Sequence, residues 1–106
     1  MWYDALHPQL QPYAAYIVEQ AGAAGLAPRI TSVFRTHGQQ AELYRKYQQG
    51  LTRYPVAPPG RSMHEYGLAW DMVVHRPDAV GGVWRTWGGR WGGDRDPVHF
   101  DVPIAV

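Results

Sequence analysis

The chain has 106 residues, a formal net charge of +1 and no cysteine. The length predicts a single domain over residues 1–106, the charge gives no electrostatic reason to expect a nucleic-acid partner, and the absence of cysteine excludes disulfides and thiolate metal sites. No apolar run is long enough to span a membrane.

Two helices are predicted in the first half of the chain. The first runs from about Gln9 to Ala24, where apolar side chains recur at helical spacing and form one face. Gly25 is expected to end it. The second runs from His37 to about Gln49. His37 has no metal-binding partner at helical spacing, so we interpret it as an N-terminal helix residue.

A strand is predicted between these helices, over Arg29 to Thr36. The residues that we expect to be buried on it are Ile30, Val33 and Phe34. The strand delivers Arg35 at its end, but its position alone assigns this arginine no role. After the second helix, residues 51–61 carry three prolines, which predict a semi-rigid loop leading directly into the next motif.

The ten residues from Ser62 to Asp71 carry the strongest sign of chemistry. His64 and Asp71 lie seven positions apart, which would separate them by about 23 Å on a straight strand. They can share a metal ion only if the chain turns between them. Gly67 lies between them and allows such a turn, because glycine accepts a backbone conformation that other residues avoid.

A strand is predicted after the turn, from Gly67 to Val74. Its alternation places larger side chains on one face, namely those of Leu68, Trp70, Met72 and Val74. Asp71 lies on the opposite face with small neighbours. The first face suits a core, and the second leaves room for an ion and a substrate.

A second cluster lies near the C-terminus, where Asp96 precedes His99 by three residues. Two histidines and one carboxylate fit a catalytic zinc site, which uses three protein ligands in a tetrahedron and keeps the fourth position for water. We therefore interpret His64, Asp71 and His99 as the ligands of one zinc ion. Asp96 is the carboxylate expected to act on the water.

The expected fold is α+β, with two helices packed on one side of a small, mainly antiparallel sheet. A last strand over Val98 to Val102 would place His99 beside Asp71 if the two strands pair antiparallel. The zinc would then lie in a groove on the other face of the sheet. In the glycine-rich run 81–93, Trp84 and Trp87 could share the face of a short helix, and at least one tryptophan there is expected in the core.

These motifs resemble the signature of the LAS-type zinc peptidases. The group contains D-alanyl-D-alanine carboxypeptidases and dipeptidases, and the L-alanyl-D-glutamate endopeptidases of bacterial cell walls and phage endolysins. The resemblance covers residues 30–100 and rests on a spaced block followed by a short one: Ser62, His64, Gly67, Ala69 and Asp71, then Asp96, His99 and Phe100. It implies zinc binding by His64, Asp71 and His99, and an acid/base role for Asp96.

The resemblance also implies roles for residues outside the metal motif. Arg35, with Gln40 five residues later, matches a strand-then-helix segment whose arginine binds substrate or stabilises the tetrahedral intermediate. A guanidinium suits that role because it can hold a carboxylate or an oxyanion through two parallel hydrogen bonds. Ser62 matches the serine of the group. We expect Ser62 and Gln40 to bind substrate, with hydrogen bonds within the site as an alternative for Ser62.

Two other carboxylates compete with Asp96 for the role of base. Asp94 follows Trp91, Gly92 and Gly93 in a block typical of the L-alanyl-D-glutamate peptidases, and here that block is nearly fused to the Asp96–His99 segment. The three-residue spacing from His99 favours Asp96. Glu65 is adjacent to His64, so it is expected to point elsewhere if His64 faces the metal.

The function implied by the resemblance is hydrolysis of a bacterial stem peptide, most directly at the L-Ala–D-Glu bond. We expect the chain to be a monomer. One alternative is a D-Ala-D-Ala carboxypeptidase with the same site, and another is a non-catalytic wall-binding module with a structural zinc. The resemblance places the action at the bacterial cell wall. The N-terminus shows no signal peptide, so we expect either phage-type release or a leader that was trimmed.

Overall fold

The structure is a computed structural model, and it describes residues 1–103. This part of the chain forms three α-helices, four strands and three short 3₁₀ turns. The helices are α1 (Gln11–Ala23), α2 (His37–Gln48) and α3 (Pro77–Thr86); the strands are β1 (Arg29–Ser32), β2 (Ala69–Val73), β3 (Arg90–Gly92) and β4 (Asp96–Asp101); the turns are η1 (Trp2–Ala5), η2 (Met63–Tyr66) and η3 (Gly93–Arg95).

The four strands form one antiparallel sheet in the order β1-β2-β4-β3. In the centre of the sheet, Trp70 pairs with Phe100 and Asp71 pairs with His99. The predicted antiparallel pairing of these two strands is therefore confirmed. Because successive residues of a strand face opposite sides, this register places the aromatic pair on one face and the polar pair on the other.

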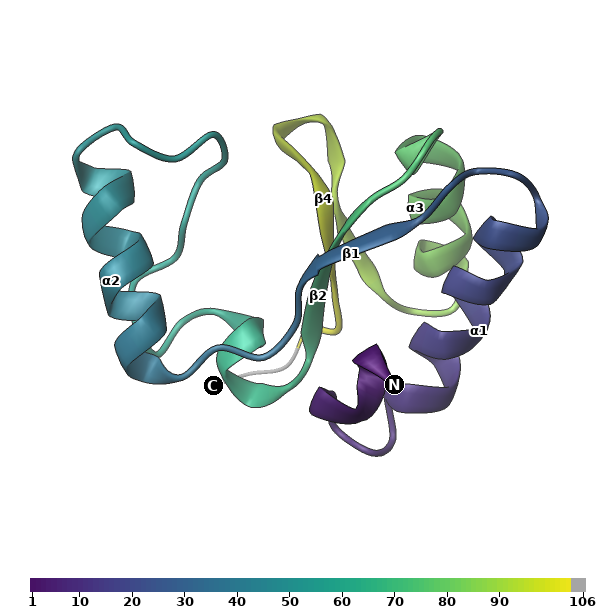
Figure 1. Cartoon of the computed structure of the whole chain (residues 1–106), viewed down its shortest axis with the longest axis horizontal. Helices are drawn as coiled ribbons and strands as arrows, with labels where there is room; N and C mark the ends of the chain where they lie inside the picture. The colour runs from purple at the N-terminus through teal and green to yellow at the C-terminus, as the bar shows by residue number, and fades with distance from the viewer. Residues whose placement is uncertain (104–106) are drawn as a thin grey trace.

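Figure 1 shows α1 and α3 together on one side of the sheet, and α2 with its following loop on the other. The core lies between the sheet, α1 and α3, and its largest buried side chains include Trp70, Met72 and Phe100. Trp70 stacks on Phe100 at a centroid distance of 5.5 Å and meets Trp84 edge-on at 4.9 Å. The predicted α+β class and core face are confirmed. The two helices that pack on the core are α1 and α3. The predicted second helix, α2, lies on the other side of the sheet and buries only Gln40.

The strand predicted over Arg29 to Thr36 is shorter than expected and ends at Ser32. After Ser32 the backbone bonds to the segment around His64: the Arg35 N–H donates to the His64 carbonyl at 3.1 Å, and the Val33 carbonyl contacts the His64 ring. Phe34 was predicted to be buried, and this was wrong: it is 49% exposed, because the chain has already left the sheet at this position.

None of the helices within residues 1–103 combines the length and apolarity that crossing a membrane requires.

Two adjacent glycines of α3 should respond in opposite ways to replacement by alanine. A Cβ added at Gly81 would lie 2.3 Å from the Trp91 ring, whereas one at Gly82 would have no neighbour within 4 Å. Gly81→Ala should lower the free energy of unfolding by about 1–3 kcal/mol through overpacking. Gly82→Ala should raise it by up to about 1 kcal/mol, because alanine favours the helix. Urea unfolding of both variants would measure this, and equal effects would contradict the packing of α3 on Trp91.

Candidate active site

A groove of about 340 Å³ lies on the face of the sheet opposite α1 and α3. Its floor carries Asp71 and His99 from the central strands, and one wall is formed by residues 52–57 of the loop that follows α2. The proline-containing loop predicted after the second helix therefore borders the groove. The sheet and the loop after α2 thus form two sides of the groove.

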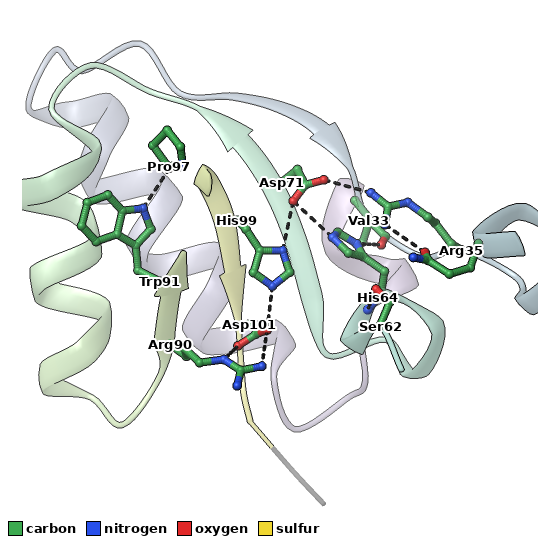
Figure 2. Close-up of polar contacts among 11 residues, drawn as sticks. Val33, Arg35, Ser62, His64, Asp71, Arg90, Trp91, Pro97, His99 and Asp101 are labelled. Carbon is green, nitrogen blue, oxygen red and sulfur yellow. Dashed lines mark hydrogen bonds and ion pairs between the residues drawn. The ribbon is translucent and has the colours of Figure 1, made fainter. Parts of the chain in front are cut away.

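The side chains of His64, Asp71 and His99 converge in this groove, as predicted (Figure 2). The Asp71 Oδ1 atom lies 3.2 Å from His64 Nε2 and 3.3 Å from His99 Nδ1. Ligand atoms at about 2.1 Å from a tetrahedral zinc lie about 3.4 Å apart. Both distances to Asp71 are close to this value, and all three ligand atoms lie within 4.8 Å of one another, so the donor set fits one zinc ion.

The turn that brings His64 to Asp71 is built as predicted. His64 lies in η2, and Gly67 follows η2 with a φ of 71°. Ser62 precedes η2 as its N-cap, and its hydroxyl oxygen accepts a hydrogen bond from the His64 N–H at 3.3 Å. A side chain on Gly67 would also approach the His7 amide nitrogen to 3.0 Å, so glycine is required here both for conformation and for space.

Each histidine uses its other ring nitrogen to hold its orientation. His64 Nδ1 lies 2.5 Å from the Val33 carbonyl, and His99 Nε2 lies 2.6 Å from Asp101 Oδ2. A carbonyl oxygen only accepts, so His64 Nδ1 carries a proton and leaves Nε2 free as a ligand. When the His99 ring is neutral, the Asp101 carboxylate selects the tautomer that carries its proton on Nε2 and leaves Nδ1 free.

The charged side chains of the groove shift one another's pKa. Burial alone would raise the pKa of Asp71, but hydrogen bonds and attraction from His64 and His99 lower it well below its ordinary range. Burial alone would lower the pKa of His99, but Asp101 and Asp71 raise it to about 9. Asp71 and Asp101 therefore favour positive charge between them, which is the charge that a metal ion would supply.

Arg35 reaches the same carboxylate from the edge of the groove. Its Nη2 donates to Asp71 Oδ2 at 3.0 Å, and its Nη1 donates to Gln40 Oε1 at 3.1 Å. Gln40 is only 1% exposed and donates in turn to the Ala57 carbonyl at 2.8 Å. With both ends of its amide engaged in this way, Gln40 positions Arg35 and ties the loop to α2.

Asp96 and Asp94 occupy different environments at the start of β4. Asp96 lines the groove, and its Oδ1 is buried without a hydrogen-bond partner among the described residues. Burial, reinforced by the negative charge of Asp71, raises the pKa of Asp96, although His99 opposes the shift. Asp94 lies in η3, is exposed and does not line the groove.

Glu65 points away from the groove, as predicted. Its carboxylate accepts hydrogen bonds from the Gly60 and Ser62 amides at 2.7–3.0 Å and pairs with His37 Nδ1. Burial would raise the pKa of Glu65, but the contacts with His37 and these amides lower it. Glu65 therefore holds the loop and η2 together and has no free oxygen aimed at the groove.

A family model described as VanY, D-alanyl-D-alanine carboxypeptidase, matches residues 4–81. This chain belongs to that family of peptidases. The peptidase is similar to CwlK, a peptidoglycan L-alanyl-D-glutamate endopeptidase of Bacillus subtilis (strain 168), at 30% identity over 125 residues, which cover 92% of this chain and 73% of CwlK. The resemblance drawn from the metal motifs is thereby confirmed at the level of the family, and membership favours an enzyme over a non-catalytic binding module.

Solved structures share the fold of the peptidase. The D,D-pentapeptidase VanY in complex with Zn(II) aligns with a TM-score of 0.71 and 22% identity over 92% of this chain and 72% of that chain. The LD-carboxypeptidase LdcB aligns with a TM-score of 0.70 and 21% identity. The match covers 92% of this chain and only 65% of the LdcB chain.

Sequence reasoning missed three supports of the peptidase site. Asp101 lies two positions after His99, so strand alternation could have placed it on the same face. Arg90 contacts Asp101 from the neighbouring strand β3, and only the register of that strand reveals the pair. The Val33 carbonyl is a backbone atom, and no residue type signals its role.

The raised pKa of His99 predicts how the stability of the metal-free peptidase depends on pH. Because the folded-state pKa is about 9 against an ordinary 6.5, the stabilisation is complete below pH 6.5 and is lost as pH rises through 9. The free energy of unfolding of chelator-treated protein should therefore fall between pH 6.5 and 9. His99→Gln should flatten this fall, whereas His75→Gln, at an exposed position, should not. Urea unfolding across this range would show it, and an unchanged slope in His99→Gln would contradict the assignment.

Proposed function

We propose that this chain is a zinc-dependent peptidoglycan peptidase of the bacterial cell wall and that it hydrolyses the L-Ala–D-Glu bond of the stem peptide. The observation that carries the proposal is the convergence of His64, Asp71 and His99 in one groove, with Asp96 on its border. The similarity to CwlK, whose name states this bond, supports the choice of bond.

The residues present suit zinc, because two neutral imidazoles and a carboxylate are ligands that it prefers. His64 Nε2, His99 Nδ1 and Asp71 Oδ1 would hold it. When bound, zinc would act as a Lewis acid toward the scissile carbonyl and would acidify a water molecule. The remaining chemistry comes from Asp96 and Arg35.

Asp96 acts as general base and then as general acid. A partly buried carboxylate with a raised pKa is suited to this, because catalysis is most efficient when the pKa approaches the working pH. Its unpartnered Oδ1 accepts a proton from the attacking water and delivers that proton to the leaving amine. Arg35 lines the groove beside Asp71 and donates to the oxyanion that develops on the carbonyl.

A D-Ala-D-Ala carboxypeptidase with the same residues in the same roles is the second candidate. The description of the matching family model favours it, and a solved structure of VanYB holds D-alanine-D-alanine. The two candidates differ only in the bond cut, so their products distinguish them.

Replacing Asp96 should separate catalysis from metal binding. Asp96→Ala should keep one zinc per chain, because Asp96 is not among the three ligands, and should lower kcat/KM by about 10²–10⁴, the usual contribution of general acid–base catalysis. Asp94→Ala is the matched control on the same segment and should remain near wild type, since Asp94 is exposed outside the groove. Zinc content and hydrolysis rates would be measured on both. A fully active Asp96→Ala, or an Asp94→Ala that loses as much, would move the role of base elsewhere.

Digestion of purified peptidoglycan should identify the bond. The L-Ala–D-Glu assignment requires new D-Glu amino termini and no free D-Ala, as read by mass spectrometry of the products. Activity should disappear with a chelator and return with zinc. Release of D-Ala would establish the carboxypeptidase instead, and turnover unaffected by the chelator would exclude the zinc mechanism.

A further inference from the structure

A buried carboxylate behind His99 takes no part in the proposed reaction. Asp101 ends β4, is 1% exposed, and places Oδ2 2.6 Å from His99 Nε2, on the side of the ring away from Asp71. Figure 2 shows His99 between the two carboxylates. Asp101 therefore contacts the nitrogen that does not face the proposed metal.

Arg90 holds this carboxylate from the edge strand. Its Nε donates to Asp101 Oδ1 at 2.9 Å and its Nη2 donates to Oδ2 at 2.8 Å, a two-bond contact (Figure 2). The two residues lie directly opposite each other in the pairing of β3 with β4. Trp84 Nε1 also donates to the Asp101 backbone carbonyl at 2.9 Å. Both the side chain and the backbone of Asp101 are thus fixed.

The contacts form a series in which Arg90 holds Asp101 and Asp101 holds His99. Oδ2 accepts from both His99 and Arg90, and Oδ1 accepts from Arg90. Without Arg90, the Asp101 carboxylate would lose two of its three side-chain hydrogen bonds and could rotate. Without Asp101, the His99 ring would lose the contact that sets its tautomer and its angle.

We propose that Asp101 and Arg90 are positioning residues for the metal centre: Asp101 orients His99 so that Nδ1 faces the cation, and Arg90 acts on His99 only through Asp101. This inference rests on the proposed zinc function. It extends the site beyond its ligands to the edge strand β3, which has no other role in the proposed reaction.

Zinc affinity is the direct readout, measured on metal-free protein by competition with a chromophoric chelator. Asp101→Ala should weaken zinc binding by about 10–100-fold, as loss of a carboxylate behind a ligating histidine typically does. Asp101→Asn keeps the size and one accepting oxygen, so it should recover part of the affinity. Arg90→Gln should cause a smaller loss. Arg76→Gln is the matched control, since it breaks an exposed arginine–aspartate contact, to Asp78, outside the groove.

The double variant tests whether Arg90 acts through Asp101. In an Asp101→Ala background, Arg90→Gln should bring no further loss of zinc affinity. The visible spectrum of the Co(II)-substituted protein should change in Asp101→Ala and not in Arg76→Gln, because only the first removes a contact that orients a proposed ligand, His99. Unfolding of the metal-free variants would confirm that they fold, and Asp101→Asn and Arg90→Gln carry the test if Asp101→Ala does not.

The outcomes separate this inference from the function on which it rests. A wild-type chain that binds no zinc would overturn both. A wild-type chain that binds zinc, with Asp101 variants that bind it equally well, would overturn only the positioning role. Additive losses in the double variant would remove Arg90 from the path to His99.

Discussion

The site depends on a single register, the antiparallel pairing of β2 with β4 that sets Asp71 opposite His99. The same register stacks Trp70 on Phe100 on the other face. A slip by one residue would turn the aromatic side chains into the groove and the ligands into the core. The hydrophobic effect that fixes the core therefore also fixes the spacing of two of the three proposed ligands. The packing of the sheet on α1 and α3 thus holds the proposed ligands in register, although the residues that line the groove come from other elements.

The third proposed ligand, His64, is positioned in a different way. A short turn capped by Ser62 and ended by Gly67 sets its backbone, and the Val33 carbonyl sets its ring. The segment after β1 leaves the sheet, and its Val33 carbonyl is thereby able to contact His64. Arg35 follows immediately and reaches Asp71 from the same segment. The early end of β1 therefore serves two members of the site.

Much of this arrangement could be predicted from the sequence, because strand alternation around Asp71 and the glycine at the turn are local signals. The core face of β2 and the convergence of the ligands followed from them. The predicted end of β1 was wrong because the residues after Ser32 form hydrogen bonds with His64, which lies far along the chain. The Arg90–Asp101 pair was missed for a similar reason, since it depends on which strand lies beside β4.

Three carboxylates that lie close to the proposed ligands in sequence have different environments. These environments indicate which carboxylate is suited to act as base. Glu65 is buried, but its oxygens accept from backbone amides and His37, so the pKa of Glu65 is lowered and a proton would cost it these bonds. Asp94 is exposed beyond the groove. Of the three, Asp96 alone combines a place in the groove with a raised pKa and an oxygen that has no hydrogen-bond partner within residues 1–103. A group that must accept a proton and release it within one turnover needs weak partners of its own, and that condition supports the proposal that Asp96 is the base.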